Sequence, residues 1–182
     1  VVTMEREDYI LGVLMAEMPA EFELEALKAQ AVAARTYMAQ KMNSSDGNDP
    51  HKGATVCTDS SHCQAYISEK DAKKKWGKNA SLYFEKCKKA VSETHDIIAV
   101  YKGEPIKAVF HAIAGGRTEN AGDVWGTDVA YLKSVETKGD ALAPKYETSV
   151  EVPIDKFKKE LSAEYGVSFD NGIIGEVTHS EG

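Results

Sequence analysis

Apolar residues recur at helical spacing over the first part of the chain. The stripe that predicts a helix over residues 5–18 consists of Tyr9, Ile10, Val13, Leu14 and Met18. Pro19 follows this stripe and blocks continuation beyond one more turn. A second helix is predicted over residues 23–42, where strong helix formers occur without Gly or Pro. The second segment is apolar nearly all round, which is typical of a helix buried in a larger core.

Shorter predicted elements separated by polar stretches make up the rest of the chain. Residues 43–53 are rich in Asn, Asp, Ser and Gly, which predicts an exposed loop or the start of an insertion. The later predicted helices cover residues 68–76, 79–94 and 154–165. The predicted strands cover residues 97–101, 106–113, 145–152 and, weakly, 172–177. Because helices and antiparallel strands occur without a βαβα rhythm, the predicted fold class is α+β.

The domain organisation follows from the length and from these elements. A chain of 182 residues is the size of one ordinary domain. We therefore expect a single catalytic domain over residues 1–182, as part of a longer protein. Residues 43–94 are expected to form an inserted loop and helical subdomain, stabilised by a metal or by a disulfide.

Composition excludes several classes of protein. Hydrophobic residues make up 42% and charged residues 28% of the chain, so a packed globular core is expected. The net charge of -7 argues against nucleic acid as a partner. The chain has no transmembrane-length apolar run, and its first residues lack the layout of a signal peptide. Phosphate-binding loops, dinucleotide fingerprints and the HExxH and GxSxG motifs do not occur.

Glu17 is the first candidate for chemistry. Its spacing from Ile10 and Val13 places it inside the apolar sector of the first predicted helix. Partial desolvation there favours the protonated carboxyl, which suits a general acid. The alternatives are a glutamate that turns outward at the helix end, or one that pairs with Arg35. Arg35 itself needs an acceptor on its apolar helix, either a structural carboxylate or a polar group of a substrate.

A second candidate site lies in the polar region after the second helix. His51, Cys57, His62 and Cys63 supply the donor set of a tetrahedral zinc site, although their spacing is unusual. Because four protein ligands leave no open position for water, a structural zinc is favoured over a catalytic one. A disulfide between Cys57 and Cys63, or free thiols, are the alternatives. Cys87 is expected to be a small buried residue of a helix.

The segment FHAIAGGRTENAGDVWGTDVAYLKSVE is the third candidate. Its paired glycines allow positive φ or the close approach of another chain. The residues after them supply a hydroxyl, an amide and an amine in Thr118, Asn120 and Lys133. This inventory suits a groove that contacts carbohydrate, and it is equally common in polar loops.

Two segments together resemble the stage II sporulation protein D family of peptidoglycan lytic transglycosylases. They are EDYILGVLMAEMPAEFELEALKAQAVAARTYMAQKM and VFHAIAGGRTENAGDVWGTDVAYLKSV, which occur in the order of the family. The resemblance implies an enzyme that cleaves glycan strands between N-acetylmuramic acid and N-acetylglucosamine. The products would carry 1,6-anhydromuramic acid ends, and the cleavage would serve engulfment of the forespore during sporulation.

The resemblance also implies roles for particular residues. The glutamate of the EMP motif is Glu17, the expected catalytic acid and base. The expected residues of a substrate groove are Arg35, Thr118 and Lys133, with weaker candidates in Gln30, Tyr37, His111 and Tyr131. Members of the family often carry serines just before the double glycine, where this chain has Ala112 and Ala114. Any hydroxyl contact from those two positions is therefore absent or replaced.

Location and partners are further implications of the resemblance. Members of the family usually carry an N-terminal membrane anchor, which would hold the protein in the mother-cell membrane, facing the space between the mother cell and the forespore. A cell-wall amidase of the engulfment complex is the expected protein partner, and catalysis requires no cofactor.

Three other functions are compatible with the same residues. A hydrolase would use water as nucleophile and a second carboxylate such as Glu119 or Asp123. A non-catalytic peptidoglycan-binding module would position or activate a cell-wall amidase without cutting glycan. A zinc-organised interaction domain would need Glu17 only for structure.

Overall fold

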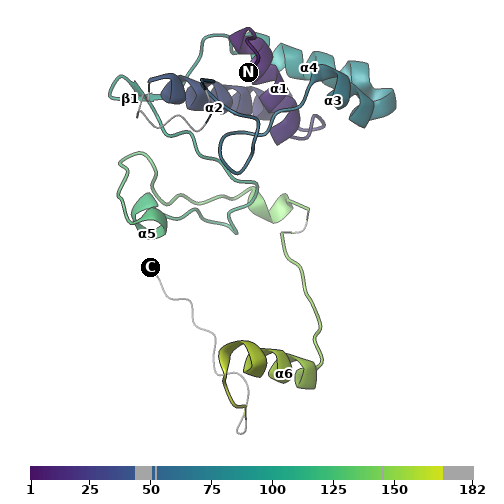
Figure 1. Cartoon of the computed structure of the whole chain (residues 1–182), viewed down its shortest axis with the longest axis vertical. Helices are drawn as coiled ribbons and strands as arrows, with labels where there is room; N and C mark the ends of the chain where they lie inside the picture. Colours follow the sequence, from purple (N-terminus) through teal and green to yellow (C-terminus); the bar gives the residue numbers. More distant parts are fainter. Residues whose placement is uncertain (44–50, 52, 145, 170–182) are drawn as a thin grey trace. The chain divides into compact units, whose positions relative to one another are not determined.

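The chain forms two compact units in a computed structural model, Val1–Phe110 and His111–Gly182 (Figure 1). The structure describes residues 1–43, 51, 53–144 and 146–169. Each unit is described by itself. The whole is helix-rich with a small antiparallel sheet, which is compatible with the predicted α+β class. A single catalytic domain stays a prediction. No helix among the described residues combines the length and apolarity needed to cross a bilayer.

Helices build the core of the first unit, and all four were predicted to within a residue or two. Their bounds are α1 Arg6–Glu17, α2 Leu24–Asn43, α3 Glu69–Trp76 and α4 Ala80–Glu93, with a short 3-10 turn η1 Gly77–Asn79 between the last two. The Ser68 hydroxyl accepts a hydrogen bond from the Asp71 amide and so caps α3. Helix α4 packs against both α1 and α2, and α3 packs against α4. Both helices predicted within residues 43–94 therefore contribute to the main core.

Arg35 is the largest fully buried side chain of this core. Its Nη2 lies 2.7 Å from Glu7 Oε2, and its Nη1 donates to the carbonyl of Ile97 at 3.1 Å. The acceptor that Arg35 needs is thus Glu7, and the alternative in which Glu17 pairs with Arg35 is wrong. The enclosed guanidinium agrees with the structural alternative for Arg35, and a contact of Arg35 with substrate stays a prediction.

The predicted β-ribbon exists but is much shorter than expected. Strand β1 is Val100–Tyr101 and strand β2 is Glu104–Pro105, with Val100 opposite Pro105. The turn consists of Lys102 and Gly103, whose φ angles of 52° and 89° suit a tight two-residue hairpin. One further hydrogen bond, from the amide of Ile106 to the carbonyl of Ala99 at 3.1 Å, extends the pairing past Pro105.

The second unit has little regular structure before its last helix. Its elements are α5 Ala121–Trp125, a 3-10 turn η2 Asp140–Leu142 and α6 Ile154–Tyr165. Helix α6 has the predicted bounds and ends at Gly166, which has the left-handed conformation of a C-cap. The predicted strand over 145–152 is wrong for the described residues 146–152, where Val150 is 84% exposed. The predicted strand over 172–177 lies outside the described residues.

Candidate functional site

Glu17 is the last residue of α1 and its side chain is half-buried. One carboxylate oxygen accepts a hydrogen bond of 2.7 Å from the backbone amide of Ala65. The side chain is therefore held in place by a segment that lies 48 residues further along the chain. Neither a fraying helix end nor a partner in Arg35 describes this glutamate.

A close backbone approach fixes that segment on α1. The amide of Ile67 donates to the carbonyl of Gly12 at 3.2 Å, and the ring of Tyr66 lies over Gly12. A Cβ atom at position 12 would lie 2.1 Å from Tyr66 Cε2, so only glycine fits there. Tyr66 also stacks on Tyr9 with ring centroids 6.0 Å apart. The extended chain from Ala65 to Ile67 is thus pressed against the helix that carries Glu17.

A hollow of about 470 Å³ opens beside Glu17. One wall is the end of α1 and the chain after it, including Met18 and Glu21. The opposite wall is the corner between α3 and α4, with Trp76 and Tyr83. Its volume lies within the range of about 300–1,000 Å³ found for small-molecule sites. A half-buried carboxyl that lines such a hollow is placed to act on a bound ligand.

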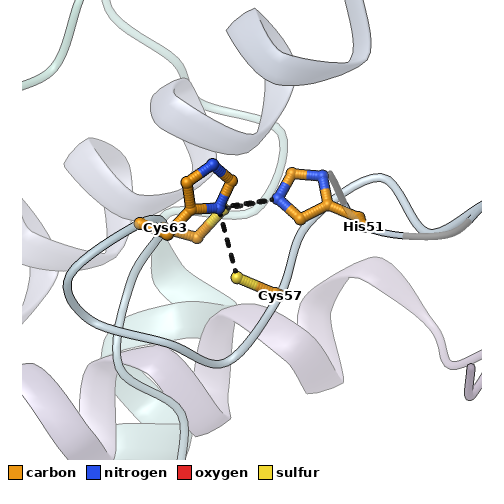
Figure 2. Close-up of side chains that lie close together, drawn as sticks. His51, Cys57 and Cys63 are labelled. Atoms are coloured by element: carbon orange, nitrogen blue, oxygen red, sulfur yellow. Dashed lines mark hydrogen bonds between the residues drawn. The ribbon is translucent and has the colours of Figure 1, made fainter. Parts of the chain in front are cut away.

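The four predicted metal ligands come together in the loop before α3. Figure 2 shows the side chains of His51, Cys57 and Cys63 pointing toward one another, and the donor atoms of all four residues lie within 4.8 Å. The His51 Nε2 to His62 Nδ1 distance is 3.0 Å. The distances from sulfur to ring nitrogen are 3.3 Å for Cys63 to His51 and 3.5 Å for Cys57 to His62. Cys57 and Cys63 are free thiols, not joined in a disulfide.

The two sulfur-to-nitrogen distances fit a tetrahedral metal ion, whereas the 3.0 Å between His51 Nε2 and His62 Nδ1 is shorter than such an ion requires. Ligands at about 2.0–2.3 Å from zinc form a tetrahedron with edges of about 3.3–3.8 Å. The donor set of two thiols and two imidazoles is the one that zinc prefers. A tight turn lets adjacent His62 and Cys63 both face the cluster, because their amides donate to the carbonyl of Asp59 at 3.1 and 2.7 Å. Asp59 Oδ1 also accepts from the amide of Ser61 at 2.8 Å, which closes the turn.

Two tyrosines, Tyr9 and Tyr37, lie near the two cysteines of the cluster. Burial raises the pKa of Tyr9 to about 12, with smaller contributions from the charges of Cys63, Cys57 and Glu17. Burial also raises the pKa of Tyr37, together with a hydrogen bond to Cys63. Both phenols therefore stay protonated at neutral pH. The hydroxyl of Tyr37, a weaker candidate for the groove, donates to the carbonyl of His62, one of the four predicted metal ligands, at 3.4 Å.

The remaining predicted groove residues lie on α2 and in the second unit. Gln30 is buried on α2, and its Nε2 has no hydrogen-bond partner among the described residues. The candidates in the second unit are His111, Thr118, Tyr131 and Lys133. A groove shared between these residues and Glu17 stays a prediction.

The second unit fixes its double-glycine loop with one carboxylate. Asp140 accepts from the amides of Ala114 and Gly116 at 2.9 and 3.1 Å. Thr118 Oγ1 accepts from the amide of Val135 at 2.9 Å, so its hydroxyl already holds the facing segment. Lys133 forms an ion pair with Asp128 at the exposed surface. In this structure Thr118 therefore orders the double-glycine loop.

Several residues of the site were not predicted from the sequence. Gly12 carried a usable signal, because a glycine inside an apolar helical stripe indicates a close approach of another segment. Ala65 contributes only its backbone amide, which no side-chain pattern marks. Trp76 and Tyr83 occupy ordinary helix positions, and their place beside Glu17 depends on how α3 and α4 pack against α1.

Comparison with known proteins identifies the family. The model of the Stage II sporulation protein family matches residues 1–101. Stage II sporulation protein D of Bacillus amyloliquefaciens is 36% identical over 172 residues, and that of Bacillus subtilis (strain 168) is 38% identical over 173 residues. Each alignment covers 94% of this chain and 49% of the relative. The chain therefore belongs to the Stage II sporulation protein family, as the two sequence segments indicated.

The chain spans about half the length of these two relatives. A protein named amidase enhancer, also from Bacillus subtilis (strain 168), is 38% identical over 121 residues. That alignment covers 66% of this chain and 14% of the relative.

Proposed function

We propose that the protein is a peptidoglycan lytic transglycosylase in which Glu17 is the catalytic acid and base. The observation that carries the proposal is the half-buried Glu17 carboxyl, held by the Ala65 amide at 2.7 Å beside a hollow of about 470 Å³. Membership of a sporulation family with similarity to Stage II sporulation protein D supports the same conclusion. The substrate is the glycan strand of peptidoglycan, which the enzyme cleaves at the bond between N-acetylmuramic acid and N-acetylglucosamine.

The chemistry needs one carboxyl and no external nucleophile. Glu17 protonates the glycosidic oxygen as the bond from that oxygen to the anomeric carbon of muramic acid breaks. The 6-hydroxyl of the same sugar then attacks the anomeric carbon, and its proton returns to Glu17. The ring that forms is 1,6-anhydromuramic acid. Because the nucleophile belongs to the reacting sugar, binding that sugar in the right conformation lowers the entropy cost of bringing the 6-hydroxyl to the anomeric carbon.

The products of wall digestion test this function. Purified peptidoglycan, intact and stripped of stem peptides, is incubated with the protein, and the soluble fragments are analysed by mass spectrometry. We expect fragments with anhydromuramic acid ends, which are one water lighter than hydrolysis products. Reducing ends in their place would assign a hydrolase, with Glu119 or Asp123 as the second carboxylate to examine.

A structural zinc bound by His51, Cys57, His62 and Cys63 is part of the proposal. Zinc at these four ligands would supply cross-linking of the loop and no catalytic step, since no coordination position remains open. The cross-link would also affect the position of Glu17, because Cys63 is two residues from Ala65 and the Ala65 amide holds the Glu17 carboxyl. We therefore propose that the metal stabilises the segment that positions Glu17.

Metal content and thermal stability test the zinc. We expect about one zinc per chain in freshly purified protein, and a melting temperature about 5 °C or more lower after chelation. Cys57→Ser and Cys63→Ser should each lose the metal. The control is Cys87→Ala, because burial raises the pKa of the Cys87 thiol to about 11 and the residue lies in the core. A metal content near zero with a mass two hydrogens lower would show a disulfide instead.

A second candidate function is a peptidoglycan-binding module that activates a cell-wall amidase. The observation in its favour is the similarity to a protein named amidase enhancer. In this case Glu17→Gln would still stimulate a partner amidase, and the purified protein would release no glycan fragments. For either function we propose an extracytoplasmic position, anchored in the mother-cell membrane and facing the forespore.

A further inference from the structure

Cys57 and Cys63 are placed to react with each other as well as to bind a metal. Both are free thiols and only half-buried, so a small reagent can reach them. Their sulfur atoms lie within 4.8 Å of one another. The sulfurs of a disulfide are about 2.05 Å apart, so bond formation needs an approach of less than about 3 Å. The loop therefore holds a pair of thiols that a modest movement can join.

A disulfide and a zinc ion exclude each other at this cluster. Zinc binds thiolates, so joining the two sulfurs removes two of the four predicted ligands and leaves only His51 and His62. In the extracytoplasmic position proposed for the protein, glutathione and thioredoxin do not keep thiols reduced. A thiol pair in that setting is open to oxidation. The cluster thus has a reduced and an oxidised form, which differ in how the loop is cross-linked.

A short stretch of chain connects the thiol pair to Glu17. Cys63 lies two residues before Ala65, whose amide donates to the Glu17 carboxylate at 2.7 Å. The residue between them is 3% exposed, so this stretch has little freedom to bulge into solvent. Just beyond it, the amide of Ile67 donates to a carbonyl of α1 at 3.2 Å and fixes the chain on that side. Movement of Cys63 toward Cys57 therefore acts on the Ala65 amide.

We propose that Cys57 and Cys63 form a redox switch, whose disulfide draws the Ala65 amide away from Glu17 and slows glycan cleavage. The proposal rests on the lytic transglycosylase function, because Glu17 is the acid of that reaction. Without its amide donor, the carboxyl is free to leave the orientation in which it protonates the glycosidic oxygen. Reduction restores the thiols, the loop and the rate.

The oxidant in this step is a low-molecular-weight disulfide. One cysteine, as the thiolate, attacks a sulfur of the oxidant, so that the S–S bond of the oxidant breaks, a mixed disulfide forms and one thiol leaves. The second cysteine attacks the protein sulfur of the mixed disulfide, which forms the bond between Cys57 and Cys63 and releases the second thiol. The two cysteines lose two electrons and two protons, which the oxidant takes up as it becomes two thiols.

Peptide mapping and hydrogen exchange test the switch without measuring activity. The zinc-loaded chain is treated with oxidised glutathione, and then with dithiothreitol and added zinc. Oxidation should lower the mass by two hydrogens, link the peptides that contain Cys57 and Cys63, and release zinc to a coloured chelator. Exchange of the Ala65 amide should become about tenfold faster because its acceptor is lost, whereas exchange within α4 should not change. Dithiothreitol with zinc should reverse each change.

Cleavage rates provide the second arm. Oxidation should slow the release of anhydro fragments by about tenfold, and reduction with added zinc should restore it. Cys57→Ser cannot form the bond, so its rate should respond less to oxidised glutathione. Cys87→Ala should respond as the parent protein does, because Cys87 is buried in the core. Reduced protein stripped of zinc separates loss of the metal from formation of the bond, and it should keep more activity than the oxidised protein.

The outcomes separate the switch from the proposed function. Equal cleavage by the reduced and the fully cross-linked protein would overturn the switch and leave the lytic function standing. A linked peptide with faster exchange at Ala65, but no cleavage by either form, would support the coupling of the loop to Glu17 and overturn the lytic function. Mixed disulfides without a bond between Cys57 and Cys63 would overturn the switch, as would an equal loss of activity on chelation alone.

Discussion

Glu17→Gln is expected to remove about 10²-fold to 10⁴-fold of the glycan-cleaving activity while the protein stays folded. The amide cannot donate a proton to the glycosidic oxygen as an acid, nor accept the proton of the 6-hydroxyl as a base. Its carbonyl oxygen can still accept the 2.7 Å hydrogen bond from Ala65, so the loop should remain on α1. Release of anhydro fragments over time gives the rate, and a pull-down with insoluble wall gives the binding.

The matched control is Glu23→Gln, which removes one carboxylate from an exposed position between α1 and α2. We expect this variant to cleave at the rate of the parent protein. If Glu17→Gln cleaves equally well, another residue supplies the proton. If it loses wall binding as well as cleavage, the carboxylate contributes to ground-state affinity and the argument for an acid weakens.

Glu7→Gln is expected to give the largest loss of stability, about 3 kcal/mol. The buried guanidinium of Arg35, which is 1% exposed, would lose its charged partner. Removing one member of a buried ion pair commonly costs about 3–5 kcal/mol, because the other charge remains desolvated. The lower value applies since the Glu7 side chain is 22% exposed and the Ile97 carbonyl still accepts from Arg35. Denaturant unfolding monitored by circular dichroism measures the difference.

The same pair predicts a dependence on pH. Partial burial alone would raise the pKa of Glu7, but hydrogen bonds and charge from Arg35, with help from Arg6, outweigh it and lower that pKa. A lowered pKa in the folded state contributes stability that is present above the unfolded pKa, about 4.3 for glutamate. This contribution is lost as the pH falls through the folded pKa. The stability difference between the parent and Glu7→Gln should therefore shrink below about pH 4.

An exposed ion pair provides the comparison. Glu69→Gln breaks the pair with Lys73 on the surface of α3 and should cost only about 0.3–0.5 kcal/mol. A similar cost for Glu7→Gln and Glu69→Gln would show that Arg35 is well solvated after all. A large cost for Glu7→Gln that does not change with pH would mean that packing, and not charge, is lost.

The helices could be predicted because local and tertiary requirements agree in them. The apolar stripe of α1 ends where Pro19 stops it, and Ser68 marks the beginning of α3 as a side-chain cap. The strands were harder because β-favouring residues alone do not supply a partner. The segment around Val150 has the composition of a strand, yet no neighbouring strand pairs with it among the described residues.

The candidate site could be predicted only for those residues whose side-chain type and spacing form a recognisable pattern. Glu17 stood out as a carboxyl in an apolar sector, and the four metal ligands as a dense group of His and Cys. The partner of Arg35 was not predictable, since Glu7 lies in a first helical turn where acidic residues are common. The hydrogen bond from the Ala65 amide depends on a route of the chain that spacing does not encode.

The contact between Gly12 and Tyr66 has a consequence for how this protein can be altered. Position 12 cannot accept a side chain without displacing the ring of Tyr66, and the displaced ring would draw Ala65 away from Glu17. The loop with the two cysteines and the helix with the glutamate therefore depend on each other for their structure, and neither can be altered at this contact alone. Grafting the loop into a scaffold with a larger residue at that helix position should transfer a metal site without transferring a working acid.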